Sequence, residues 1–294
     1  MSNPPVVLVV GSLHHDIMVE ADHLPRADET AVGSRWYPKF GGKGGNQAVA
    51  ARAAGAGARM FGAVGRDGFG TFLLAGLDAG GVDRRFVREL AGTGSGMSVA
   101  IQNSDGDYAA TIVSGTNLCL EAADLDQATL WADVAVLVLQ NEIATEMNVA
   151  AARAAKARGV LVILNAAPAR DVPRELREVV NILVVNAVEA EMSGAGPVTD
   201  LPTALSAARH LAAHYDSVVV TAGSKGLAVW TLEDEQITLP ARKVDVVSSH
   251  GAGDCFTGAL AASLARGTPL SIACREASDA AAAHVSRQPA LLAS

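Results

Sequence analysis

The sequence predicts an α/β fold, a Rossmann-like parallel sheet sandwiched by helices, with a small β-sheet lid. Three observations carry this prediction. Short apolar runs rich in β-branched residues recur along the chain, Ala-rich helical stretches lie between them, and two segments, 16–37 and 95–113, break the alternation. Strands buried on both faces are continuously apolar, and strands that alternate with helices form parallel sheets covered by helices.

Five runs have the length and composition of buried strands: Val6–Val10, Val134–Leu139, Val160–Leu164, Ile182–Val185 and Val218–Thr221. Three Ala-rich stretches are expected to be helices: Glu146–Arg158, Val172–Val180 and Pro202–His214. Connections between parallel strands are right-handed, so these units stack into one sheet. Because no Pro- or Ser-rich linker and no repeat interrupts the chain, we expect residues 1–294 to form one domain.

The two exceptional segments are strand-like but lack the helical stretches that surround the other strands. In the second, Met97–Ile101 and Tyr108–Val113 flank the turn Asn103–Asp107, a pattern typical of a hairpin. We expect segments 16–37 and 95–113 to pair into a small sheet. Open α/β sheets bind ligands at the carboxyl ends of their strands, so a sheet covering those ends would be a lid.

Composition excludes several classes of protein. The chain has 294 residues, of which 50% are hydrophobic and 18% charged, so it can bury a large core. Its formal net charge of -8 argues against general binding to nucleic acid or to an anionic membrane. Three widely spaced cysteines, an N-terminus without a basic signal region and the lack of a membrane-length apolar run predict a cytoplasmic protein.

The glycine-rich segment Phe40–Gln47 runs directly into a helical stretch. Glycine lets the backbone approach a ligand closely, and the free N–H groups of a helix start attract anions. Lys43 and Asn46 add donors for hydroxyls or anions. A simple chain turn is the alternative. The segment is not a Walker A loop, and no Gly-x-Gly-x-x-Gly occurs, which disfavours a dinucleotide-dependent oxidoreductase.

The segment Ser249–Gly258 also precedes a helical stretch. Its Gly251-Ala252-Gly253 would form a nest of N–H donors suited to a phosphoryl group that carries transition-state charge. A carboxylate beside such a nest, at Asp254, is well placed to accept a proton from an attacking hydroxyl. An ordinary helix cap would explain Asp254 as well.

Three further groups of polar residues follow predicted strands. Asn186 and Glu189 either supply oxygen ligands to Mg²⁺, usually through water, or cap a helix. The loop Thr221–Gly226 either contacts phosphate or makes a hairpin turn. After the first strand, the pair His14-His15 lacks a third ligand at metal-binding spacing, so Asp16 as an acceptor for hydroxyls is the favoured interpretation there.

These segments, in this order, resemble the ribokinase family of carbohydrate kinases (PfkB type) over essentially the whole chain. Gly11-Ser12 with Asp16, the Gly41–Gln47 segment, Asn165–Arg170, Asn186 with Glu189, and Gly251–Asp254 match its ordered landmarks. The resemblance implies a ribokinase-like body with a β-sheet lid that often makes a homodimer. It also implies ATP-dependent phosphorylation of a sugar's primary hydroxyl.

The resemblance also implies roles for individual residues. The catalytic group comprises Asp254 as base and an anion hole of Gly251, Ala252 and Gly253. The sugar would be held by Asp16, Gly42, Lys43 and Asn46, with Glu142 nearby and His14 where the family usually carries an Asn. ATP would be contacted by Thr221, Gly223, Ser224 and Gly226, and Mg²⁺ would be organised by Asn186 and Glu189.

Other departures concern the monovalent cation of the family. Ser248-Ser249 stands where an Asp-Thr pair is common, and the tail Ser286–Ala290 lacks the usual Gly-Ala segment. A neutral serine gives a weaker field for an ion, so we expect little activation by K⁺. The predicted function is phosphorylation of ribose or a related pentose. The alternatives are a nucleoside kinase of the same family and a sugar-binding regulatory protein without transfer activity.

Overall fold

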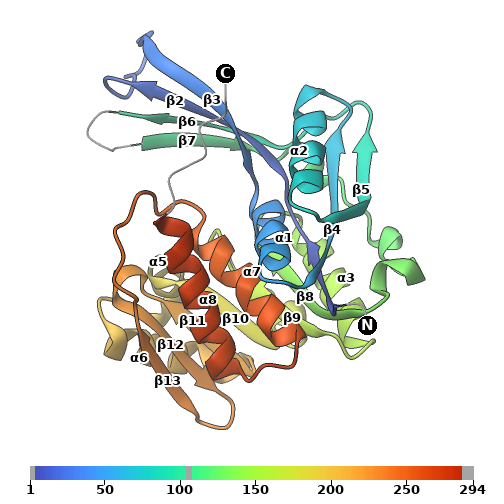
Figure 1. Ribbon diagram of the computed structural model, residues 1–294, viewed down its shortest axis with the longest axis vertical. Helices are drawn as coiled ribbons and strands as arrows, with labels where there is room; N and C mark the ends of the chain where they lie inside the picture. The colour runs from blue at the N-terminus through green and yellow to red at the C-terminus, as the bar shows by residue number, and fades with distance from the viewer. Residues whose placement is uncertain (1–3, 104–107, 287–294) are drawn as a thin grey trace.

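The computed structural model describes residues 4–103 and 108–286. Its main sheet has nine strands in the order β13-β12-β11-β10-β9-β8-β1-β4-β5 (Figure 1). The parallel strands are β1 (Val6–Val10), β4 (Gly57–Gly65), β5 (Asp83–Leu90), β8 (Val134–Gln140), β9 (Leu161–Asn165), β10 (Ile182–Asn186) and β11 (Ser217–Thr221). An antiparallel edge is added by β12 (Gly226–Thr231) and β13 (Gln236–Pro240). The five predicted strands are present, each within two residues of its expected bounds.

Helices cover both faces of the sheet, as predicted (Figure 1). One layer consists of α1 (Lys43–Ala53), α2 (Gly68–Ala79), α7 (Ala252–Ala265) and α8 (Leu270–Val285). The other consists of α3 (Thr145–Lys156), α4 (Arg174–Arg177), α5 (Ala187–Ala190) and α6 (Leu201–Leu211). Short 3₁₀ turns lie at Gly115–Leu118, Ala122–Asp126, Ala128–Trp131, Ala212–His214 and Gly223–Lys225, and a π turn lies at Glu191–Ala195.

The predicted helix Val172–Val180 is wrong in length, because only Arg174–Arg177 is helical. Pro173 caps its start in an extended conformation, as expected for a residue whose ring fixes φ. The segment then ends where Val180 packs into the core beneath the next strand.

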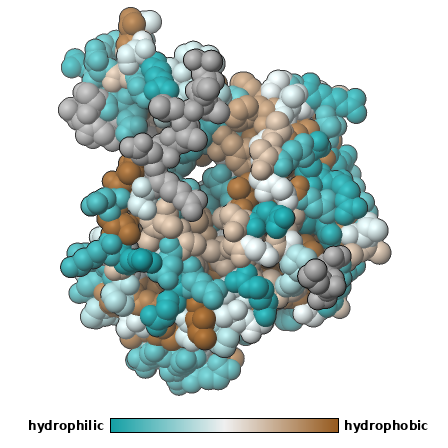
Figure 2. Space-filling view, viewed as in Figure 1, coloured by the Kyte–Doolittle hydropathy of each residue, from teal (hydrophilic) through white to brown (hydrophobic). Residues whose placement is uncertain are grey.

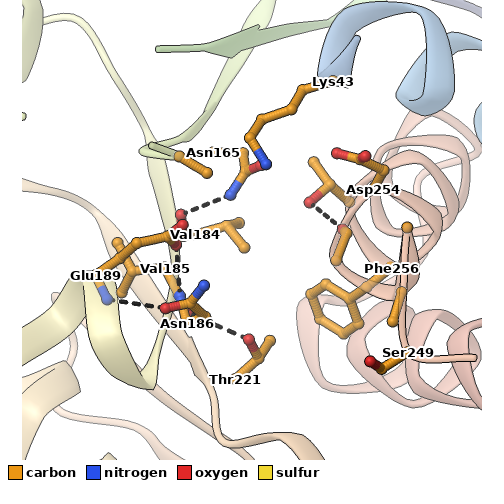
Figure 3. A pocket seen from close by; sticks show the side chains of 15 residues that line it. Lys43, Asn165, Val184, Val185, Asn186, Glu189, Thr221, Ser249, Asp254 and Phe256 are labelled. Atoms are coloured by element: carbon orange, nitrogen blue, oxygen red, sulfur yellow. Dashed lines mark hydrogen bonds between the residues drawn. The ribbon is translucent and has the colours of Figure 1, made fainter. Parts of the chain in front are cut away.

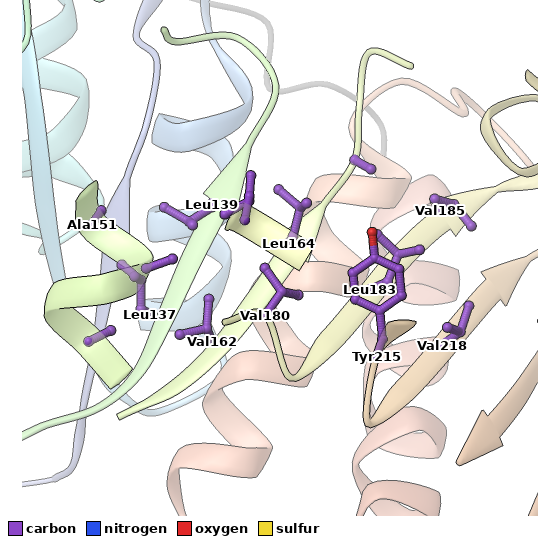
Figure 4. Close-up of a cluster of buried hydrophobic side chains, with 14 of the residues drawn as sticks. Leu137, Leu139, Ala151, Val162, Leu164, Val180, Leu183, Val185, Tyr215 and Val218 are labelled. Carbon is purple, nitrogen blue, oxygen red and sulfur yellow. The ribbon is translucent and has the colours of Figure 1, made fainter. Parts of the chain in front are cut away.

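The core lies in two layers, one on each face of the sheet. Successive strand residues point to opposite faces, so Val7 and Val9 pack under α1 and α2, while Leu8 and Val10 face the α3–α6 layer. Figure 4 shows part of the latter cluster, where small α3 side chains such as Ala151 let the helix approach the Leu137 region closely. Within the described part of the chain, no helix is long and apolar enough to cross a membrane.

A separate four-stranded sheet stands over the main body (Figure 1). Its order is β3-β2-β6-β7, from β3 (Gly33–Gly41), β2 (His14–Ala21), β6 (Met97–Gln102) and β7 (Tyr108–Val113). The two exceptional segments therefore do pair into a small sheet, through the parallel contact of β2 with β6. The hairpin of β6 and β7 is present, and residues 104–107 of its predicted turn lie outside the described residues.

Helices α1 and α7 pack almost backbone to backbone. A Cβ atom added at Gly258 of α7 would lie 2.5 Å from the Gln47 carbonyl oxygen and 2.8 Å from the Ala51 nitrogen of α1. Only glycine fits such an approach. As Asp254 lies one helical turn before Gly258, the contact also brings the Asn46-Gln47 pair of α1 against Asp254.

Candidate active site

A cleft opens at the carboxyl ends of the central strands. Its strand side carries Asn165 at the end of β9, Asn186 at the end of β10 and Thr221 at the end of β11. Lys43 and Asp254 face them from the first turns of α1 and α7 (Figure 3). The molecular surface is hollowed between the lid sheet and the body (Figure 2). The predicted segments therefore converge where an α/β sheet binds its ligands.

The first turn of α7 is the segment predicted to form a nest of N–H donors. Gly251 precedes the helix with φ of 79°, a left-handed conformation that glycine adopts without strain, and no side chain caps the helix start. The first amides of a helix have no partner within the helix, so they can point at an anion. Gly253 lines the cleft, and a Cβ atom added there would meet nothing within 4 Å. An anion therefore has open space beside Gly253, whereas the Ala252 N–H donates to the Ser249 carbonyl at 3.3 Å.

Asp254 is buried beside this nest, with 8% of its surface exposed. Its two carboxylate oxygens accept hydrogen bonds from Asn46 Nδ2 at 3.1 Å and from Gln47 Nε2 at 2.9 Å. Burial raises the pKa of Asp254, and the charge of Lys43 and the two amide donors oppose this effect. A carboxylate with a raised pKa and a fixed orientation is suited to general-base work.

Gln47 joins Asp254 to the ends of the central strands. Besides Asp254, its Nε2 donates to Asn165 Oδ1 at 3.0 Å, and its Oε1 accepts from Gln140 Nε2 at 2.8 Å. The side chain is fully buried. We did not predict a role for Gln47, although it follows Asn46 directly in the glycine-rich segment. Neighbouring residues on a helix point in different directions, so only the packing of α7 reveals that both amides reach one carboxylate.

The start of α1 is pressed against the segment that leaves β1. Gly44 lies where a Cβ atom would be 2.6 Å from the Ser12 nitrogen, and Gly42 has φ of 86°. Glu142 fixes this junction, because its Oε2 accepts hydrogen bonds from the Lys43 backbone N–H at 2.8 Å and from Ser12 Oγ at 2.5 Å. Glu142 thus lies beside the predicted sugar residues and links the backbone of one predicted motif, at Lys43, to the Ser12 side chain of another.

The lid strand β2 presents His14 and Asp16 on one face. Asp16 Oδ1 accepts a hydrogen bond from Ser98 Oγ at 2.5 Å, and His14 Nδ1 lies 3.7 Å from Glu142 Oε2. His14 is buried, and its Nε2 has no hydrogen-bond partner among the described residues. These two predicted residues therefore lie together with Glu142 at the foot of the lid.

Lys39 is a further cation at this place, which we did not predict from the sequence. It pairs directly with Asp16 across β2 and β3, so both side chains share one face of the lid. Within the described residues it forms no ion pair or hydrogen bond, and it is half-buried. Burial lowers the pKa of Lys39, against the opposing charges of Asp16 and Asp254.

Asn186 and Glu189 form a reciprocal helix cap. Asn186 Oδ1 accepts from the Glu189 N–H, and Glu189 Oε2 accepts from the Asn186 N–H, both at 2.8 Å. The helix-cap interpretation of this pair is therefore correct, but it does not exclude a second role. Glu189 also lines the cleft, and burial raises the pKa of its carboxyl group.

The residues present fit a Mg²⁺ ion that binds one protein carboxylate and keeps waters and substrate phosphates as its remaining ligands. No cluster of three His, Cys, Asp or Glu side chains that could hold a metal occurs in residues 4–103 and 108–286. Glu189 has one oxygen outside the cap contact, facing a cleft whose other wall is an anion nest. Mg²⁺ is usually bound by one or two carboxylates together with waters and substrate phosphates, and this donor set suits that mode.

The loop after β11 is the turn of a hairpin. Strand β12 returns antiparallel to β11, and a Cβ atom at Gly226 would collide with the backbone of β13. Thr221 lines the cleft, whereas Gly223 and Ser224 are exposed beyond it. Ser248 lies in the loop before α7, and residues 287–290 of the tail predicted to affect K⁺ binding lie outside the described residues.

The fold and this cleft are those of a phosphotransferase of the α/β class, in which a helix start without a side-chain cap and a buried carboxylate face the strand ends beneath a lid. The chain belongs to the pfkB family of carbohydrate kinases, whose family model matches residues 5–292. It is thus a carbohydrate kinase, which transfers a phosphoryl group to a sugar hydroxyl.

Two relatives and one solved structure show how close this similarity is. The chain is 33% identical to ribokinase of Mus musculus, over 90% of this chain and 84% of the relative. It is 31% identical to deoxyribokinase of Salmonella typhi, over 87% and 84%. A structure of Arabidopsis thaliana ribokinase complexed with ribose and ATP superimposes with a TM-score of 0.89 at 30% identity, covering 98% of this chain and 95% of that one.

The hydrogen bond from Gln47 should tune the carboxyl group of Asp254. Replacing Gln47 with Met removes a donor that lowers the pKa of Asp254, so this pKa rises further. A base must be ionised, and the acid limb of the kcat profile should therefore move to higher pH. The check is kcat against pH at saturating substrates, with the exposed Gln127→Met as the matched control. An unmoved or more acidic limb would contradict this coupling.

Proposed function

We propose that the protein phosphorylates the primary hydroxyl of ribose or a related pentose with ATP, and that Asp254 is the general base. The observation that carries the proposal is the position of the buried Asp254 carboxylate. It lies between the amide nest of α7 and the polar group formed by Lys43, Asn46 and the foot of the lid. A hydroxyl and a phosphoryl group bound on these two sides would meet at Asp254.

In the proposed reaction, the hydroxyl oxygen of the sugar attacks the terminal phosphorus of ATP. The proton of this hydroxyl moves to the Asp254 carboxylate as the new oxygen–phosphorus bond forms. The bond from phosphorus to the bridging oxygen breaks, and ADP leaves with that electron pair. The products are the sugar phosphate, ADP and one proton, which Asp254 later returns to solvent. Positioning and charge stabilisation account for most of the rate in such transfers.

The negative charge of the transferred group would be met by two elements of the chain. The amides of Gly251, Ala252 and Gly253 donate from one side, and the Lys43 ammonium lies in the same cleft. Mg²⁺ bound to the nucleotide, with Glu189 directly or through water, would neutralise further phosphate charge. The Arabidopsis ribokinase complex with ATP supports ATP as the nucleotide.

The pentose assignment draws on the relatives, which include ribokinase and deoxyribokinase. Asp16 and Glu142 would accept hydrogen bonds from sugar hydroxyls, and His14 would border the same space. The test is coupled ATP turnover across ribose, 2-deoxyribose, other pentoses, hexoses and nucleosides. Preference for a pentose supports the proposal, preference for nucleosides supports the rival kinase, and sugar binding without turnover supports a regulatory protein.

We also propose that the protein is a homodimer joined through its lid sheets. Trp36 and Val113 lie on the same face of the lid and are 65% and 53% exposed. A small sheet with an exposed apolar face is stabilised when that face is covered. Replacing Trp36 with Glu should therefore shift a dimer to monomer in light scattering. Leu232→Glu, at an equally exposed turn of the main body, should leave the mass unchanged. A wild-type protein that is monomeric at all concentrations would contradict the proposal.

A further inference from the structure

The loop that precedes the amide nest is tied to the end of α8. The backbone N–H groups of Val247 and Ser248 donate to the Val285 carbonyl at 2.8 and 3.3 Å. The loop is held again at His250, three residues after Val247. The side chain of His284 contacts the His250 carbonyl, with Nε2 3.0 Å from the oxygen. Because a carbonyl can only accept, Nε2 of His284 must carry the hydrogen in this contact. The last turn of α8 therefore holds the loop at two places.

The contact of His284 lies directly at the start of the nest. The His250 carbonyl belongs to the peptide group that leads into Gly251, where the chain turns through its left-handed conformation. A Cβ atom added at Gly251 would lie 3.2 Å from His284 Nε2, so the imidazole packs against the glycine itself. Because a peptide group is planar, the orientation of the His250 carbonyl fixes the orientation of the Gly251 N–H, the first amide of the nest.

Within the loop, this peptide is flanked by two long hydrogen bonds, from the Ala252 N–H to the Ser249 carbonyl and from the His250 N–H to Ser248 Oγ, both at 3.3 Å. Val246 and Val247 are 63% and 50% exposed, so apolar packing does not fix the loop. No side chain caps the start of α7. Within the described residues, a second side-chain link between the loop region and α8 is the ion pair of Arg242 with Asp279, at 3.4 Å, which is longer than the His284 contact and, like it, exposed.

We propose that His284 is a positioning residue, which acts on catalysis through the His250 carbonyl. Its Nε2–H fixes the peptide before Gly251, and the nest amides then point into the cleft in the free enzyme as well as in the complex. Donors that are oriented before the reaction need no reorganisation as charge develops on the phosphoryl group. The proposal rests on the proposed role of the nest in phosphoryl transfer.

The same hydrogen bond bears on the expected indifference to K⁺. An ion held by loop carbonyls would compete for the His250 oxygen, which already accepts from an imidazole of the same chain. His284 thus supplies internally a donor to a carbonyl that would otherwise face solvent. The expected lack of K⁺ activation would then have a second cause besides the serine at position 248.

The test compares His284→Leu, which removes the donor, with His284→Gln, whose amide can still donate to a carbonyl. We expect kcat to fall about tenfold in the Leu variant, the size of one lost hydrogen bond of about 1.4 kcal/mol, with KM values within twofold of wild type. The Gln variant should recover most of kcat. Asp279→Asn, which weakens the exposed ion pair on the same helix, is the matched control.

Amide hydrogen exchange gives a readout that does not depend on turnover. The amides of residues 247–254 should exchange faster in His284→Leu than in wild type, and at the wild-type rate in His284→Gln. This result supports the positioning role even if pentoses prove not to be substrates. Unchanged exchange and kcat in the Leu variant, or a Gln variant as impaired as the Leu variant, would overturn the proposal.

Discussion

Replacing Asp254 with Asn lowers kcat by about 10²–10⁴-fold while sugar and nucleotide still bind, because general-base assistance is typically of this size. The amide keeps the size of the side chain and can still accept a hydrogen bond from Gln47. Binding is measured by calorimetry with each substrate, and kcat by coupled ADP release. Turnover near the wild-type value would show that Asp254 is not the base.

The stability of the same variant provides its control. Burial raises the pKa of Asp254, so the folded state holds this proton more tightly than the unfolded chain does. The resulting stabilisation is complete below the unfolded pKa and is lost as pH rises through the folded pKa. At neutral pH the ionised carboxylate therefore lowers the free energy of unfolding. The Asn variant removes this cost but also loses one accepted hydrogen bond, because its NH2 group must face Asn46 or Gln47. Thermal unfolding of the variant is therefore measured, and a variant that is folded at the assay temperature shows that its lost activity does not come from unfolding.

Replacing Gly253 with Ala should lower kcat/KM for ATP by about 10²-fold, comparable to the loss of one oxyanion-hole donor. The added Cβ meets no protein atom within 4 Å, so the fold has room for it. Because Gly253 lines the cleft, the added methyl group would take up space that the proposed phosphoryl group needs. The loss should therefore appear in nucleotide kinetics and calorimetry and not in thermal unfolding.

Gly68→Ala is the matched control for this substitution. Gly68 is likewise in the first turn of a helix, at the start of α2, and an added Cβ would meet nothing within 4 Å there. This position lies outside the cleft. Equal effects of the two alanines on ATP kinetics would mean that Gly253 does not face the phosphates.

The part of the site that could be predicted consists of residues adjacent in the chain. Gly251, Gly253 and Asp254 share one helical turn, so their combined chemistry is visible in consecutive letters. Lys39 and His284 could not be found in this way. Lys39 reaches the site through its register opposite Asp16, and His284 through the packing of α8 against a loop more than 30 residues earlier. Such contacts are set by tertiary structure.

The strands of the fold likewise divide into those visible in consecutive residues and those determined by tertiary structure. Continuous runs of Val, Ile and Leu identified the central strands, since few other structures bury such runs on both faces. Strand β4 (Gly57–Gly65) was missed because its Gly, Ala and Arg residues have low strand propensity, and its position between β1 and β5 determines its conformation. For Asn186 and Glu189 the sequence left two roles open, Mg²⁺ binding and a helix cap. The reciprocal hydrogen bonds of the pair show that the helix cap is present.

The close contact at Gly258 makes α1 and α7 a single mechanical unit. The Gly258 backbone lies against Gln47, Ala50 and Ala51 of α1, so sliding of either helix would cause a collision, and the contact sets the distance from Asn46 to Asp254. We therefore expect any opening and closing of the cleft to occur elsewhere, in the strands that connect this helix pair to the lid. Substrate entry would thereby be separated from the alignment of the reacting groups, which would keep their positions while the lid moves.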